Sequence, residues 1–199
     1  VLDAQLAFSR NGITWRRAGQ RQPFLDRGSI GDWDEMMACV PPIPIRVGDE
    51  LYIYYGGSNS HHDWWIVGAR EGLDVPEAKD IGIVQHGIGL SKLRFDGFVS
   101  LRTGPVREGL LVTRSVVAKG THLLINANCH VDGYIDVEVS DHQGRVIHDL
   151  SRTEVCRFKG NSVDHQVKWR KSDKWPKNQV VKLRFWMRNS DLYSFAFSN

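Results

Sequence analysis

The apolar residues of this chain recur at every second position or in short runs, and Gly, Asp and Asn separate these segments. A period of two is typical of β-strands that bury one face. Residues 182–188 alternate Lys, Arg or Trp with Leu, Phe and Met, so we expect one apolar and one polar face there. Residues 189–191 are expected to turn into a last strand. The strand-like segments are 47–57, 86–101, 121–129, 133–141, 162–169 and 180–197.

The pattern predicts little helix. The best helical candidate, residues 71–80, contains Pro76 in its middle, so it predicts one short turn at most. The sequence therefore predicts an all-β protein.

The character of the chain changes near residues 102–110. Most Trp and Tyr residues and the loop His residues precede this stretch, and evenly spaced strands with tight turns at 131–133 and 142–144 follow it. We therefore predict two domains, 1–104 and 105–199. Even strand spacing in the second is typical of an antiparallel β-sandwich of two packed sheets.

Composition narrows the classes of function. The chain has 199 residues, 41% of them hydrophobic and 25% charged, which is typical of a soluble globular protein. Its net charge of +3 is spread along the sequence, so no block of charge indicates a nucleic acid. No apolar run approaches the roughly 20 residues of a membrane helix, so no membrane partner is expected.

The sequence indicates no cofactor and no metal. Cys39, Cys129 and Cys156 are far apart, which allows one disulfide at most and gives no zinc-binding spacing. The phosphate-binding, dinucleotide-binding, serine-hydrolase and zinc-protease motifs are absent from the sequence.

Residues 6–19, LAFSRNGITWRRAG, predict a hairpin. Asn11 can bond its own backbone and Gly12 accepts a positive φ, and both properties are typical of a tight turn. Ser9, Asn11, Gly12 and Trp15 also match the S-x-D-G-x-x-W hairpin of propeller proteins, with Asn in place of Asp.

With residues 23–59 and 87–101, this motif resembles the C-terminal blades of five-bladed propeller glycosidases, the broad group of glycoside hydrolase families 32 and 43. The chain is more closely similar to bacterial propeller proteins in which such blades are followed by a sandwich that ends in a motif like residues 183–197. The resemblance implies glycoside hydrolysis, a carbohydrate partner and an extracellular or periplasmic location.

A complete five-bladed propeller needs on the order of 250 to 300 residues, and residues 1–104 supply only about two blades. The missing blades belong to a longer chain or to another chain, or they are lost. Incomplete sheets expose their edges, which favours self-association.

The loop at 31–44, GDWDEMMACVPPIP, carries the candidate catalytic residues. Glycoside hydrolysis needs two carboxyl groups, one as acid and one as base or nucleophile. The resemblance implies that Asp34 or Glu35 is one of them, with a partner on an earlier blade. The alternative is a solvated acidic turn in which Asp32 or Asp34 caps backbone amides.

The stretch 54–65, YYGGSNSHHDWW, is the second candidate, because aromatic rings beside His and Asp suit a sugar-binding wall. A surface loop is the alternative. A metal site would require an irregular loop, since adjacent strand residues point to opposite faces. The predicted substrate-binding residues are Trp33, Tyr54, Tyr55, His61, His62, Asp63, Trp64 and His86.

The first hypothesis is a carbohydrate-active protein that forms part of a glycoside hydrolase. The second is a non-catalytic carbohydrate-binding or structural module. An enzyme must bring a second carboxylate within roughly 5 to 10 Å of the first, whereas a binding module needs an aromatic platform with hydrogen-bonding neighbours. In the second domain, Trp169, Trp175 and Trp186 are expected to be core or interface aromatics.

Overall fold

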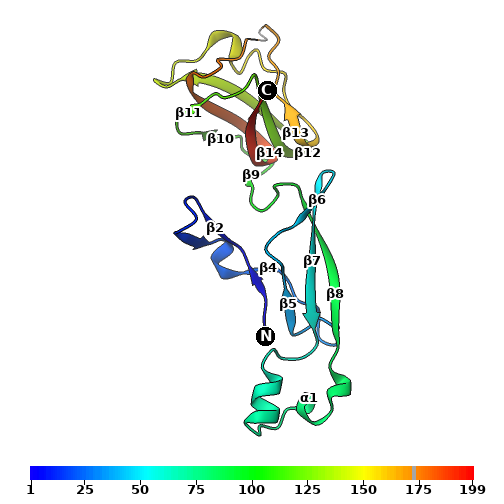
Figure 1. Cartoon of the computed structure of the whole chain (residues 1–199). Helices are drawn as coiled ribbons and strands as arrows, with labels where there is room; N and C mark the ends of the chain where they lie inside the picture. The colour runs from blue at the N-terminus through cyan, green and yellow to red at the C-terminus, as the bar shows by residue number, and fades with distance from the viewer. Residues whose placement is uncertain (172–173) are drawn as a thin grey trace. The chain divides into compact units, whose positions relative to one another are not determined.

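The chain is predominantly β, as the alternating pattern predicts. The computed structural model describes residues 1–171 and 174–199 (Figure 1). They form two compact units, Val1–Leu93 (unit 1) and Arg94–Asn199 (unit 2). The predicted division at 104/105 lies within unit 2, directly after β9 (Leu101–Thr103). No helix among the described residues is long and apolar enough to cross a membrane.

The main sheet of unit 1 is built on β7 (Glu50–Ser58). β5 (Met37–Cys39) pairs with the end of β7, β6 (Ile45–Val47) pairs with its start, and β8 (His86–Arg94) also pairs with it. Two small sheets accompany this one, β1 (Ala4–Gln5) with β4 (Pro23–Leu25), and β2 (Ala7–Ser9) with β3 (Trp15–Arg17). The short helical segments are η1 (Gly19–Arg21), η2 (Trp65–Arg70), α1 (Pro76–Lys79) and η3 (Ile81–Ile83). The single turn of α1 agrees with the prediction for residues 71–80.

The predicted hairpin is confirmed between β2 and β3. The Asn11 side-chain oxygen accepts hydrogen bonds from the backbone N–H groups of Ile13 at 3.0 Å and Thr14 at 2.8 Å. Gly12 has φ +72°, a conformation that side chains with a Cβ rarely adopt. The Asn that replaces Asp in the motif therefore keeps the turn chemistry.

Two long antiparallel strands, β12 (His122–Asp141) and β14 (Val180–Ser198), form the centre of unit 2 (Figure 1). β13 (Asn161–Gln166) pairs with β12. β9, β10 (Gly109–Val112) and β11 (Val116–Val117) pair with β14, and η4 (His148–Leu150) lies between β12 and β13 in the sequence.

The turns predicted at residues 131–133 and 189–191 are wrong, because β12 and β14 continue through them. Asn189 has φ 42° and Asp132 has φ 59°, and the register of the pair shifts between Cys129 and Tyr134. The Asn189 side-chain amide donates to the carbonyl of Val131 at 2.8 Å. The turn-forming residues at 131–133 and 189–191 thus form a paired irregularity within two continuous strands.

The larger apolar core lies in unit 2. Alternate residues of β12 and β14 supply it, and the predicted apolar face of 182–188 is confirmed: Leu183, Phe185 and Met187 are buried. Residues between β12 and β13 and residues after β13 complete the cluster. Its buried members include Leu123, Ile125, Ile135, Val137, Val139, Leu150, Val155, Phe158, Trp169, Val181, Leu183, Phe185 and Met187.

Candidate functional site

The acidic loop before β5 is held by its own carboxylates. Asp32 accepts a hydrogen bond from the backbone N–H of Ser29 at 2.7 Å, and Glu35 accepts one from the N–H of Gly31 at 2.6 Å. The backbone N–H groups of Asp32 and Glu35 donate to the carbonyls of Ser29 and Asp32. For Asp32 and Glu35 the structure therefore supports a turn-capping role.

Asp34 differs from its two neighbours. Its side chain is turned inward, only 6% exposed, and its Oδ2 accepts a hydrogen bond from the hydroxyl of Tyr55 at 2.7 Å. This hydrogen bond, followed by burial and the negative charge of Asp34, raises the pKa of the Tyr55 phenol. The phenol therefore remains a donor, and the carboxylate has one oxygen fixed as an acceptor.

An aromatic pair lies beside this carboxylate. The rings of Trp33 and Tyr55 stack with centroids 5.9 Å apart and an interplanar angle of 19°. Trp33, Asp34 and Tyr55 are called the Asp34 cluster from here on. A fixed carboxylate next to an aromatic face can bind a ligand that carries both hydroxyl groups and apolar C–H faces.

The side chains of the Asp34 cluster pack directly against glycines of β7 and β8. A Cβ on Gly57 would lie 2.6 Å from the Asp34 Cβ and from the Trp33 ring, and one on Gly87 would lie 2.8 Å from that ring. A Cβ on Gly89 would lie 2.3 Å from the Tyr55 ring. Separations below 3.0 Å do not occur at real Cβ atoms, so β7 and β8 can accommodate these rings only where they lack side chains. The signal was present in the sequence as the alternation His-Gly-Ile-Gly-Leu at 86–90, but sequence reasoning missed its meaning.

A second carboxylate approaches Asp34 from the same loop. The position of a Cβ on Gly28 would be 2.2 Å from Oδ1 of Asp34 and 3.1 Å from Oδ2 of Asp32. The two oxygens are therefore no farther apart than the sum of these distances. Both side chains come from one turn.

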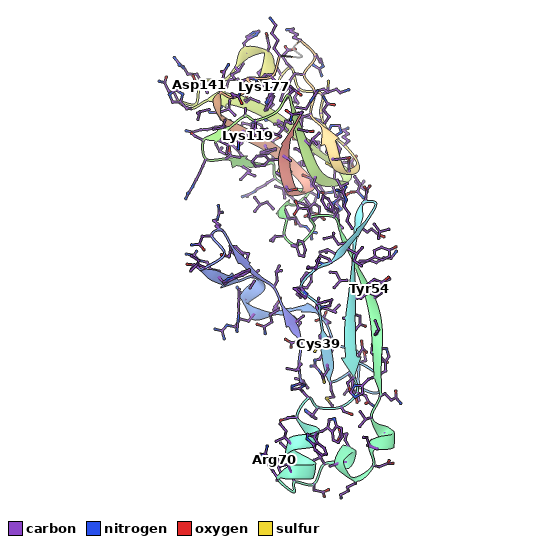
Figure 2. All side chains as sticks on the ribbon, viewed as in Figure 1. Cys39, Tyr54, Arg70, Lys119, Asp141 and Lys177 are labelled. Atoms are coloured by element: carbon purple, nitrogen blue, oxygen red, sulfur yellow. The ribbon has the colours of Figure 1, made fainter. Side chains whose placement is uncertain are left out.

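The other predicted binding residues lie elsewhere in unit 1. Tyr54 is on the opposite face of β7 from Tyr55 and is 45% exposed; its side chain is labelled in Figure 2. His61, His62 and Asp63 are exposed in the turn before η2. Trp64 contacts Trp65 edge-on, with centroids 6.4 Å apart.

His86 is exposed at the first position of β8. In the part of the chain that the structure describes, no hydrogen bond joins His61, His62 or His86 to the Asp34 cluster. The same residues contain no group of three or more His, Cys, Asp or Glu side chains placed to hold a metal ion. Of the predicted site residues, Trp33, Asp34 and Tyr55 are thus the ones that the structure brings together.

Unit 2 contains charged clusters that the sequence analysis missed. Asp136 is buried on β12 and accepts hydrogen bonds from Arg157 at 2.8 and 2.7 Å and from Arg152 at 3.1 Å. Arg152 also pairs with Glu108 and lies over the Trp186 ring, 4.5 Å from its centroid. The guanidinium groups neutralise this carboxylate, and its burial keeps it from contact with a ligand.

Asp191 on β14 forms a second charged cluster. Its carboxylate accepts hydrogen bonds from Arg102 at 2.7 and 3.1 Å and from Ser100 at 3.1 Å, and it lies 2.9 Å from Nε2 of His130. Burial alone would raise the pKa of Asp191, but the hydrogen bonds outweigh burial and hold it below its ordinary value. The cluster ties β9 to β14, which is a structural role.

Comparison with protein-family models, with curated proteins and with solved structures finds no match. The assignment of a function to the Asp34 cluster therefore rests on its residues and their geometry.

Proposed function

We propose that the Asp34 cluster binds carbohydrate and that the chain is part of a glycoside hydrolase-like protein. The observation that carries this proposal is the buried Asp34 carboxylate, held by the Tyr55 hydroxyl beside the stacked Trp33 ring. Sugars present apolar C–H faces to aromatic rings and hydroxyl groups to carboxylates, so both kinds of contact are provided within one small cluster.

In the hydrolytic form of the proposal, Asp34 is the carboxylate that acts as base or nucleophile. Glu35 is the weaker candidate, since its side chain caps the turn at Gly31 and is not part of the Asp34 cluster. Tyr55 is a positioning residue: its hydrogen bond fixes one oxygen of Asp34 and directs the other. The acid that protonates the leaving group would come from a further propeller blade.

Under the same proposal, unit 1 corresponds to about two propeller blades and unit 2 to an accessory β-sandwich. The apolar face of the β6–β7–β8 sheet supports the need for further protein around unit 1. Ile45 pairs with Tyr52 and Val47 with Glu50, and Lys92 bonds Glu50, so the alternate positions 88 and 90 of β8 share this face. The exposed apolar side chains on it are Ile45, Val47, Tyr54, Ile88 and Leu90.

The second candidate function is a non-catalytic binding module. The observation that favours it is the position of Asp32, which approaches Asp34 from the same turn and bonds Ser29. Two carboxylates on one side of a ligand cannot act on its opposite faces, as inverting hydrolysis requires. For this chain alone, binding is the function that the described residues support.

Binding is tested first, by electrophoresis of the chain through gels that contain soluble polysaccharides. Asp34→Asn keeps the shape of the side chain but removes its charge. We expect the affinity obtained from the retardation to fall about tenfold, which corresponds to the loss of one charge-assisted hydrogen bond. The matched control is Asp49→Asn, an exposed aspartate in the turn before β7. Equal retardation of both variants and the wild type would contradict the proposal.

Hydrolysis is tested in a protein that carries this chain together with additional propeller blades. We expect Asp34→Asn to abolish release of reducing sugar, and Glu35→Gln to retain most of it. Loss of activity in Glu35→Gln with full activity in Asp34→Asn would reverse the assignment.

A further inference from the structure

Unit 2 contains a cavity of about 280 Å³ at the start of β12, and its described lining residues differ from those of the two charged clusters. Pockets for drug-sized ligands begin at roughly 300 Å³, so this cavity suits a ligand with one ring. It is lined by Thr121, His122, Leu123, Leu150, Gln166, Val167, Lys168, Trp169, Lys174 and Trp175.

Two indole rings form the aromatic part of this cavity. Trp169 and Trp175 lie with centroids 6.1 Å apart, tilted by 32°. Trp169 is 7% exposed and its N–H donates to the carbonyl of Val137 at 3.2 Å, which fixes it as part of the core. Trp175 is more exposed and also contacts Phe197, with centroids 5.7 Å apart. Trp175 therefore offers a supported ring to a ligand.

Among the described residues that line the cavity, the Lys and Arg side chains are those of Lys168 and Lys174, and none is Asp or Glu. Among the described residues, Lys168 takes part in no ion pair, whereas the neighbouring acid Glu154 is bonded by Lys171 at 2.8 Å. A cavity with this lining favours an anion over a cation.

Uncharged polar groups complete the lining. Gln166 and Thr121 carry side chains that both donate and accept hydrogen bonds. The Thr121 hydroxyl lies 2.7 Å from Nδ1 of His122. A ligand with hydroxyl groups, such as a sugar, therefore fits this lining better than a purely apolar ring does.

We propose that this cavity binds a single acidic sugar, a ring that carries hydroxyl groups and one carboxylate. The Trp175 ring would contact the C–H face of the sugar, Lys168 would pair with the carboxylate, and Gln166 and Thr121 would bond the hydroxyls. This site is independent of the Asp34 cluster, since every residue that forms it belongs to unit 2.

The test is calorimetric titration of the full chain with sodium glucuronate, with glucose as the neutral ring of similar size and benzoate as the ring without hydroxyls. We expect saturable binding of glucuronate in the millimolar range, and about fivefold weaker binding of glucose, the equivalent of one screened ion pair. Absence of saturable glucuronate binding, or equal affinity for all three compounds, would overturn the proposal.

Variants locate the binding. Lys168→Gln changes an exposed side chain and should weaken glucuronate about fivefold, while Lys119→Gln, an exposed lysine outside the cavity, should not change it. Trp175→Phe retains a ring and should bind, whereas Trp175→Ala should not. Loss of binding in Trp33→Leu, with none in Lys168→Gln, would place the ligand at the Asp34 cluster and overturn this site while supporting the proposed function.

Discussion

Replacement of Asp136 by Asn tests whether the buried carboxylate of β12 stabilises unit 2. The side chain is 1% exposed and accepts three hydrogen bonds from Arg152 and Arg157. Asn preserves the volume but removes the charge, and its amide group must face at least one guanidinium. Breaking a buried ion pair costs about 3 to 5 kcal/mol.

The lower end of that range applies here, because the Arg152 and Arg157 side chains remain 30% and 45% exposed and water can solvate them after the change. We therefore expect the free energy of unfolding of unit 2 to fall by about 3 kcal/mol. The measurement is urea unfolding followed by amide hydrogen exchange of peptides from β12 and β14, which reports unit 2 alone. Asp164→Asn, an exposed aspartate on β13, is the control. A difference from wild type within about 0.5 kcal/mol would refute the reasoning.

Three further predictions concern unit 2. Burial raises the pKa of Cys129 to about 11, so Ellman's reagent at pH 8 should modify the exposed Cys39 and Cys156 first and Cys129 at least about tenfold more slowly; equal rates would contradict this. Burial lowers the pKa of His165, so the unfolded chain takes up its proton first and stability should fall as the pH drops below about 6.5; an unchanged slope in His165→Gln would count against it. The lowered pKa of Asp191 stabilises the fold above the unfolded value of about 3.9, so Asp191→Asn should destabilise the protein at pH 7 and approach wild type as the pH falls through the folded pKa; a deficit that does not change with pH would exclude a role of the charge.

The sequence was sufficient to predict strand content and the faces of strands, because both depend on local alternation. Residues 182–188 show this, since their apolar positions are buried and their polar positions are not. The turn at 189–191 could not be excluded locally. Asn, Ser and Asp favour turns in any chain, and only the pairing of β14 with β12 on both sides of Asn189 makes the strand continuous.

The candidate site is predictable only in part. Residue type alone marks Trp33, Asp34 and Tyr55 as candidates, but their contact depends on the approach of the loop to β7. Which of the acidic residues would be buried also depends on tertiary contacts. Glu35 and Asp34 are adjacent in the sequence, yet one caps a turn and the other accepts from a tyrosine. Residue type alone therefore cannot say which of two adjacent acidic residues is buried and which caps a turn.

The unequal distribution of the core has a consequence for the Asp34 cluster. Among the described residues of unit 1, the buried apolar side chains are Ala38, Leu51 and Ile53, and the remaining buried apolar side chains belong to unit 2. Leu51 and Ile53 share the face of β7 that carries Tyr55, so this small core supports the cluster from one side. The other face of the sheet carries exposed apolar side chains beside the Lys92–Glu50 ion pair, with Ile88 81% exposed.

A sheet with one solvent-exposed apolar face gains little from burial and opens easily. Protein that covers this face, whether further blades or a second copy, would therefore rigidify the strand that holds Tyr55 and so fix the orientation of Asp34. Sedimentation at micromolar concentration tests the second-copy form, and we expect self-association that Ile88→Lys and Leu90→Lys together reduce. If the wild type and the double variant are both monomers, the second-copy form is wrong. Further blades would then have to cover this face, and unit 1 should bind polysaccharide more tightly when those blades are present.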